Sequence, residues 1–303
     1  MRIDVIAPGA VEATPTTAGR ERAHGLAHAA AVLTAGEFLD HLNEIGLNAT
    51  NVARPALESG AVTGDPIVNL GRFNALIAHA ATRAIAEERR PVLMGGTCSH
   101  LIGMIAGLQQ AYGATARIGL VWFDAHGDFN TPRTSHSGML GGMPVAVSAG
   151  LCHAPWREIA GQAVPLPTDR ILFVDVRNLD PEEADLIHAT DATIARFGED
   201  GSIAEIRAAV ARLAGQVDHI YLHVDADVLD RSLQPNHPTA EPNGPDVATT
   251  NSAIATVFAT AKVRAYGVVS INPDGPEGEI SLASGSELIR QGLAAWAANE
   301  SGV

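Results

Sequence analysis

The chain is poor in the residues that mark several classes of protein. Lys262 is the only lysine among 303 residues, so chemistry that depends on a lysine amine has a single candidate. Cys98 and Cys152 are the only cysteines, which argues against a disulfide framework and is typical of a reducing cytoplasm. No apolar run approaches the roughly 20 residues of a membrane span, and residues 1–8 lack the basic and then apolar order of a signal peptide. We therefore expect a cytoplasmic protein.

Positive charge is also scarce. The formal net charge is −14, the isoelectric point is about 5.2, and no basic run occurs. Nucleic acid and anionic membranes are therefore not expected as partners. What the chain does have is apolar residues, at 46% of its length, and they are enough to build a large buried core.

The first of two unusual stretches is residues 121–130, which read Val-Trp-Phe-Asp-Ala-His-Gly-Asp-Phe-Asn. Because side chains on an extended chain alternate between faces, Asp124, His126 and Asp128 can all point the same way. Two carboxylates and an imidazole at the end of a buried strand are costly unless a cation lies beside them. The alternative is a polar turn whose aspartates cap a helix.

A second stretch favours the cation. Residues 219–230 again place two aspartates, Asp225 and Asp227, directly after an apolar strand. Ligands of α/β sheets bind at the carboxyl ends of parallel strands, where we expect both stretches to end. Oxygen-rich ligation with one imidazole suits Mn²⁺ or Mg²⁺ better than a structural zinc site, and shared carboxylates would hold two ions.

Three blocks in the expected order resemble the signature blocks of the arginase/agmatinase (ureohydrolase) family. Residues 124–132 and 134–138 resemble its D-A-H-x-D-x-N-T…S-G block. Residues 223–230 resemble its x-x-D-x-D-x-L-D block, and residues 94–99 resemble its G-G-D-H-S block. The resemblance extends over nearly the whole chain and implies a binuclear metallohydrolase.

The resemblance implies two divalent metal ions, Mn²⁺ above all, with a bridging hydroxide as the nucleophile. One ion would take Cys98, Asp124, Asp128 and Asp225, and the other would take His126, Asp124, Asp225 and Asp227. It also implies that Asn130, Ser137 and Asp180 hold the carboxylate and amine of an amino-acid substrate. For Asp180, capping of the helix that begins at Pro181 is an equal alternative.

Cys98 departs from the family, which has a histidine ligand at this position. The same exchange is found in a branch of N-hydroxyarginine amidinohydrolases, which this chain also resembles in residues 127–132 and 140–143. We expect Cys98 to be a ligand, although a small cysteine after two glycines is more commonly a packed apolar residue. His100 is the rival ligand, and we expect it to face the first turn of the following helix.

Gly141 is a second departure, because arginases have a proton-shuttling histidine there and glycine cannot transfer protons. His136 and His223 are nearby candidates, although a structural role or a place at the rim is the better interpretation for each. The candidate catalytic residues are therefore Asp128, His126 and His223.

Ser270 is the third departure. It stands where the family has a glutamate that grips the guanidinium, and serine cannot supply that charge. Acidic residues occur in nearby loops, where solvation is the simpler interpretation: Asp274, Glu277, Glu279 and Glu241.

Strand-like and helix-like segments alternate along the chain. Strands are predicted at residues 2–6, 91–94, 118–123, 171–176, 220–224 and 265–271. Helices are predicted at residues 36–45, 73–88, 100–112, 202–213, 249–260 and 288–298, with another beginning at Pro181. The segment after Gly9 and residues 48–65 are predicted to be loops. This alternation predicts one α/β domain over residues 1–303, with a mostly parallel sheet in a three-layer α/β/α arrangement.

The predicted activity is hydrolysis of a C–N bond in a guanidino, hydroxyguanidino or related amidine group of a small-molecule substrate. One alternative is a formimino-amino-acid or other amidine hydrolase on the same scaffold. Gly141 and Ser270 together motivate a second alternative, a metal-binding family member without catalysis. The resemblance further implies a homo-oligomer, either a trimer or a hexamer.

Overall fold

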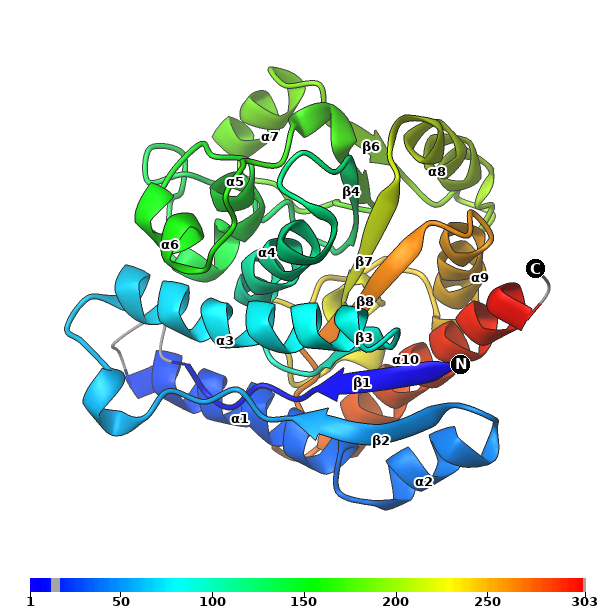
Figure 1. The fold of residues 1–303 in the computed structure, drawn as a ribbon. Coiled ribbons are helices and arrows are strands. Elements are labelled where there is room, and N and C mark those ends of the chain that lie inside the picture. The colour runs from blue at the N-terminus through cyan, green and yellow to red at the C-terminus, as the bar shows by residue number, and fades with distance from the viewer. Residues whose placement is uncertain (12–16, 302–303) are drawn as a thin grey trace.

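A single parallel sheet forms the centre of the molecule in the computed structural model, which describes residues 1–11 and 17–301 (Figure 1). Its strand order is β2-β1-β3-β8-β7-β4-β5-β6, and all neighbouring strands run parallel. The strands are β1 (Arg2–Ile6), β2 (Asn48–Ala53), β3 (Arg90–Met94), β4 (Ile118–Phe123), β5 (Ile171–Val174), β6 (Thr193–Ala195), β7 (His219–Asp225) and β8 (Val263–Val269).

Helices cover both faces of the sheet and bury a separate hydrophobic core on each (Figure 1). One core packs α3 (Pro66–Ala86), α4 (Leu101–Tyr112), α5 (Pro144–Ser148), α6 (Ala154–Ile159) and α7 (Pro181–His188). The other packs α1 (Thr17–Leu33), α2 (Glu37–Glu44), α8 (Ala204–Gln216), α9 (Val247–Phe258) and α10 (Gly278–Ser301). The prediction of a three-layer α/β/α fold is confirmed. No helix in the described ranges is both long and apolar enough to cross a membrane.

Local sequence explains the central elements. All six residues of β4, Ile-Gly-Leu-Val-Trp-Phe, are buried, as expected for a strand between two helical layers. Asp65 caps α3 by accepting hydrogen bonds from the backbone amides of Ile67 and Val68, and Pro66 occupies its first turn.

Two loop predictions were wrong. Within residues 48–65, β2 forms and pairs with β1, although its polar residues give it no apolar alternation. Of the segment after Gly9, residues 12–16 lie outside the described residues, and α1 begins at Thr17. The helix predicted at residues 73–88 begins at Pro66.

The strand register determines where the site forms. Phe123 of β4 pairs with Val224 of β7, and Asp225 pairs with Val269 of β8. The residues that follow these strands, including Asp124 and Ser270, therefore reach the same edge of the sheet. β3 pairs with β8 and ends beside them at Met94.

Candidate metal centre

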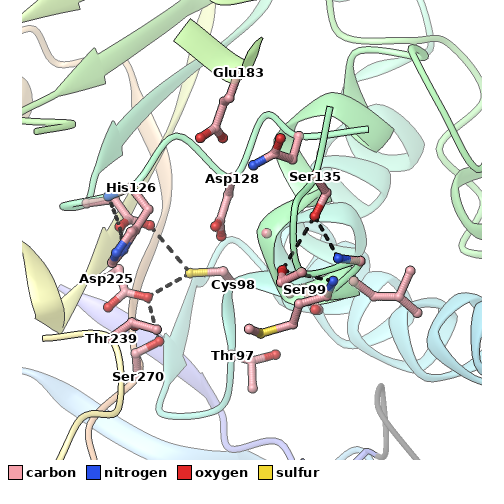
Figure 2. Close-up of a pocket in the computed structure, with 18 of the residues that line it drawn as sticks. Thr97, Cys98, Ser99, His126, Asp128, Ser135, Glu183, Asp225, Thr239 and Ser270 are labelled. Atoms are coloured by element: carbon pink, nitrogen blue, oxygen red, sulfur yellow. Dashed lines mark hydrogen bonds and ion pairs between the residues drawn. The ribbon is translucent and has the colours of Figure 1, made fainter. Parts of the chain in front are cut away.

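A cavity of about 830 Å³ opens at this edge of the sheet (Figure 2). Nearly all of the predicted site residues line it, as does Ser270: Cys98, Asp124, His126, Asp128, Asn130, Ser137, Asp180, Asp225 and Asp227. The topology thus brings together residues from blocks that are far apart in the sequence.

Cys98 lies in a short 3-10 helix, Cys98–His100, that follows β3. Its Sγ atom lies 2.8 Å from Oδ2 of Asp225 and 3.8 Å from Oδ2 of Asp124 (Figure 2). Burial, and then the nearby carboxylates, raise the pKa of the Cys98 thiol well above its usual value. A thiolate at this position therefore requires a cation beside it.

His126 points its Nδ1 atom between two carboxylates, 3.3 Å from Oδ1 of Asp124 and 3.2 Å from Oδ2 of Asp227. Divalent ions hold oxygen and nitrogen ligands at about 2.0–2.2 Å, which places neighbouring ligand atoms about 3 Å apart in an octahedron. The distances from Nδ1 of His126 to the two carboxylate oxygens are of that order, so one ion could contact all three side chains. Burial acts to lower the pKa of His126, but hydrogen bonds and charges from the two aspartates raise it to about 12.

The four aspartates crowd negative charge into a buried space. Burial, and then the other carboxylates, raise the pKa of Asp124 well above its usual value and that of Asp225 to about 7. Burial is also the main cause that raises the pKa of Asp128. Burial acts in the same direction on Asp227, but its contacts with His126 outweigh it and lower the pKa. Without cations, this set of carboxylates is not fully ionised.

Three groups of side chains have ligand atoms close enough to share an ion: Cys98, Asp124 and Asp225; Asp124, His126 and Asp227; and Asp225, Asp227 and His237. Asp124 belongs to two of them, as expected of a ligand shared by two ions. These oxygen, nitrogen and sulfur donors, in an anionic buried cavity, therefore fit two divalent cations. Asp128 faces the same cavity from a left-handed turn with φ of 45° but belongs to none of the three groups (Figure 2).

Of the three other histidines considered from the sequence, His223 and His100 lie in the core, whereas His136 is exposed, with its Nε2 atom 2.9 Å from Oε2 of Glu182. His223 is fully buried and stacks on Trp122 at 4.1 Å, with its Nδ1 atom 2.9 Å from the Tyr221 hydroxyl. It lies two residues deeper in β7 than Asp225 and is not among the described residues that line the cavity. His100 accepts a hydrogen bond from the backbone amide of Thr97 and stacks on a phenylalanine, so it faces the helix as expected. Neither is among the described residues that line the cavity.

Asn130, Ser137 and Asp180 lie on the wall of the cavity formed by the segment after β4 and by the start of α7. The Asn130 amide donates a hydrogen bond to Oδ2 of Asp180 at 3.1 Å. Asp180 occupies the N-cap position of α7, but its side chain makes no capping hydrogen bond. The carboxylate therefore faces the cavity rather than the helix end.

Sequence reasoning missed several residues of the site. Glu183 is buried, accepts a hydrogen bond from the backbone amide of Phe129 at 2.8 Å, and lines the cavity (Figure 2). Its spacing of three from Asp180 on a helix was the signal available. His237 and Thr239 approach Asp227 from a loop that has no strand or helix pattern.

Sequence comparisons match this chain to proteins of one family. The family model described as "Arginase family" matches residues 20–294. The arginase of Bacillus caldovelox is 30% identical over 203 residues, which cover 66% of this chain and 67% of the relative. The arginase of Bacillus subtilis (strain 168) is 28% identical over 202 residues, which cover 66% of this chain and 67% of that relative.

Solved structures show the same fold. An arginase from Bacillus cereus superposes with a TM-score of 0.82 at 21% identity, covering 96% of this chain and 98% of the other. A formimidoylglutamase from Bacillus subtilis superposes with a TM-score of 0.72 at 15% identity, covering 97% of this chain and 86% of the other. At these low sequence identities, the superpositions are evidence for the fold alone.

Proposed function

The chain belongs to the arginase family, and we propose that it hydrolyses a C–N bond of a guanidino, hydroxyguanidino or related amidine group with the help of two divalent ions. The observation that carries the proposal is the pair of ligand groups that share Asp124 at the edge of the sheet. A hydrolase of C–N bonds is the activity that family membership supports. The identities of the substrate and of the metal go beyond what family membership supports and are proposed from the site.

We assign the two ions as follows. One would be held by Cys98, Asp124, Asp128 and Asp225, and the other by His126, Asp124, Asp225 and Asp227. Mn²⁺ suits a set dominated by carboxylates. When bound, a pair of such ions supplies Lewis acidity and lowers the pKa of a water molecule toward neutrality.

The protein's own groups position the substrate and move protons. Asp128 faces the cavity and would accept a proton from the attacking water and return it to the leaving nitrogen. Asn130, Ser137 and Asp180 would hold the amine and carboxylate of an amino-acid substrate. Gly141 adds no proton donor, and a Cβ at that position would meet only Met139, at 3.8 Å, so space is left there for substrate.

Charge selects among the possible substrates. With two divalent ions bound, four ionised carboxylates and a Cys98 thiolate would leave a formal charge of −1, and the ions would be weaker Lewis acids than with a neutral imidazole. The neutral Ser270 hydroxyl offers no charge to a guanidinium, and it donates a hydrogen bond to Oδ2 of Asp225 at 2.5 Å. A guanidinium placed beside Ser270 would therefore find no carboxylate at that position. A weakly basic N-hydroxyguanidine can enter neutral and is the better match.

The formimino-amino-acid alternative is less well matched. Formiminoglutamate carries two carboxylates, and the described residues that line the cavity include no lysine or arginine to pair with them. Those residues do include six carboxylates: Asp124, Asp128, Asp180, Glu183, Asp225 and Asp227. A dicarboxylic substrate would therefore meet excess negative charge.

A substrate panel tests the proposal. We expect kcat/KM for N-hydroxyarginine to exceed that for arginine, agmatine and formiminoglutamate by at least about tenfold, or ~1.4 kcal/mol, at equal metal loading. The Asp225→Ala variant, which removes a shared ligand, should lose both ions and all activity. Arginine or agmatine as the best substrate would contradict the charge argument. No turnover of any substrate with two ions bound would favour a non-catalytic protein.

A further inference from the structure

Residues 237–241, which read His-Pro-Thr-Ala-Glu, form a segment of the loop between β7 and α9 that supplies none of the ligands assigned to the two ions. Residues 238 and 239 form a turn, closed by a hydrogen bond of 3.1 Å from the Ala240 amide to the His237 carbonyl oxygen. His237, Thr239 and Glu241 all reach side chains assigned to a single ion, the one held by His126 and Asp227. We call this stretch the outer segment.

His237 and Thr239 act on the same carboxylate oxygen. The Thr239 hydroxyl donates a hydrogen bond to Oδ2 of Asp227 at 3.1 Å, and Nδ1 of His237 lies 3.4 Å from that oxygen. The two side chains also contact each other, with Nδ1 of His237 3.0 Å from the Thr239 hydroxyl. The His237 side chain is 1% exposed. The orientation of Asp227 is thus fixed by buried groups.

Glu241 acts on His126 from the opposite side to the aspartates. Nδ1 of His126 faces Asp124 and Asp227, so Nε2 is its outward nitrogen, and Oε1 of Glu241 lies 3.9 Å from it. Asn178 donates a hydrogen bond to the same Oε1 at 2.7 Å and so orients the carboxylate. The distance to His126 suits charge attraction or one bridging water. A carboxylate at the outward nitrogen favours the tautomer that leaves Nδ1 free to bind a metal.

Arg177 fixes the outer segment to the strand ends. Its guanidinium donates hydrogen bonds to the carbonyl oxygens of Asp227, Val228, Leu229, Glu241 and Pro242 at 3.0–3.3 Å. It also pairs with Asp175, just after β5, at 2.8 Å. Asp227 and Glu241 therefore share one anchor, and the outer segment cannot move far without disturbing the turn that carries Asp227.

We propose that the outer segment is a positioning element for the ion held by His126 and Asp227, through His237 and Glu241, and that it gives no such support to the ion held by Cys98. The proposal rests on the two-ion site of the proposed function. Loss of either side chain should weaken the ion at His126 by about 10- to 100-fold, the usual effect of removing a group that orients a ligand. Affinity at Cys98 should stay the same.

Cobalt distinguishes the two ions, because only an ion bound to Cys98 can give thiolate-to-cobalt charge-transfer absorption. Full-length metal-free protein and the variants His237→Asn and Glu241→Gln are titrated with Co²⁺. Equilibrium dialysis counts both ions, and the charge-transfer band follows the ion at Cys98. In both variants we expect the band to titrate as in the unchanged protein, while the ion without a thiolate ligand binds 10- to 100-fold more weakly.

His219→Asn is the matched control, since His219 begins β7 at the end away from the cavity and stacks on Tyr112. It should bind both ions as the unchanged protein does. If His237→Asn does not fold, as judged by circular dichroism, Thr239→Val removes one hydrogen bond to Asp227 and gives the same measurement.

Two further results separate this role from the proposed function. Equal affinities in the variants and the unchanged protein, or a parallel loss at both ions, would overturn the positioning role alone. An unchanged protein that binds fewer than two Co²⁺ ions, or lacks the thiolate band, would overturn the assigned ligand set and this role with it.

Discussion

Cys98 is the residue whose chemistry most distinguishes this site. Its thiol donates a hydrogen bond to Asp225, and the Ser270 hydroxyl donates to the same carboxylate oxygen. One oxygen of the shared ligand is therefore surrounded by two groups that the sequence marked as departures from the family. If a metal replaces the thiol proton, the donor set becomes softer on this side of the site.

Replacing Cys98 by histidine should shift metal preference toward Mn²⁺ and away from Zn²⁺ and Co²⁺, because imidazole is harder than thiolate. We expect a change of several-fold in the ratio of bound metals after competitive loading, measured by mass spectrometry of the metals. Cys152→Ser is the control, because Cys152 is only half-buried and does not line the cavity. An unchanged ratio, together with free alkylation of Cys98 in metal-loaded protein, would show that the thiol is no ligand.

Part of the site could be predicted from single residues. Asp124, Asp225 and Asp227 were predicted as ligands because carboxylates directly after apolar strands must meet at one sheet edge. The depth of a residue within a strand was not predictable, so His223 was a candidate catalytic residue although it lies in the core. His237 was also beyond prediction, because a loop brings it to Asp227 across ten residues that have no period.

At the scale of elements, burial decides which predictions succeed. The strand at residues 118–123 was predicted with its observed bounds because it is apolar throughout. β2 was missed because an edge strand with one neighbour carries Asn48, Thr50 and Asn51, which lack the alternation of a half-buried strand. Strand propensity and apolar alternation both reflect how deeply a strand is buried, and an edge strand such as β2 is buried little.

The turn between β3 and the short helix at Cys98 is an element that we expect to tolerate little change. Gly96 has φ of 83°, and a Cβ there would lie 2.5 Å from the His100 ring and 2.6 Å from Pro8. Gly96→Ala should therefore cost about 1–3 kcal/mol of unfolding free energy through strain and overpacking. It should also weaken metal binding, because His100 holds the turn that carries Cys98.

The Gly46→Ala variant separates backbone strain from overpacking as causes of the lost stability. Gly46 has a similar φ of 87°, but nothing lies within 4 Å of a Cβ built there. Urea denaturation of both metal-free variants measures the difference, and only Gly96→Ala should lose metal affinity. Equal losses of stability with unchanged metal binding would show that the turn does not position Cys98.

At the scale of the whole molecule, alternating elements predicted a parallel sheet between helical layers, and the structure has one. The strand order was not predictable, because it depends on pairings between distant segments, such as β3 with β8. That pairing matters for function, since it brings the turn after Met94 beside Asp225. The cytoplasmic location and the trimer or hexamer implied by the family remain predictions.

The charge gathered at the sheet edge should make the stability of the whole molecule depend on metal and pH together. In the metal-free protein, burial and the neighbouring Asp227 raise the pKa of Asp225 to about 7 from an ordinary value of 3.8. Between these values the folded state holds a proton that the unfolded state has lost, so stability falls as pH rises. The free energy of unfolding that is lost through Asp225 over this pH range is roughly 4 kcal/mol at most. His126, with its pKa raised to about 12, acts in the same direction above its ordinary pKa of 6.5.

Bound ions reverse this dependence, because they replace the protons and hold the carboxylates ionised in the folded state. Thermal unfolding from pH 5 to pH 8 should therefore show Tm falling with pH in chelator, while the Tm difference between Mn²⁺-loaded and metal-free protein grows. Asp225→Asn, which cannot titrate, should flatten the metal-free curve. If the metal-free protein instead gains stability over this range, the buried aspartates are already paired with other cations or exposed to solvent. The sheet edge would then not be the anionic cavity on which the two-ion proposal depends.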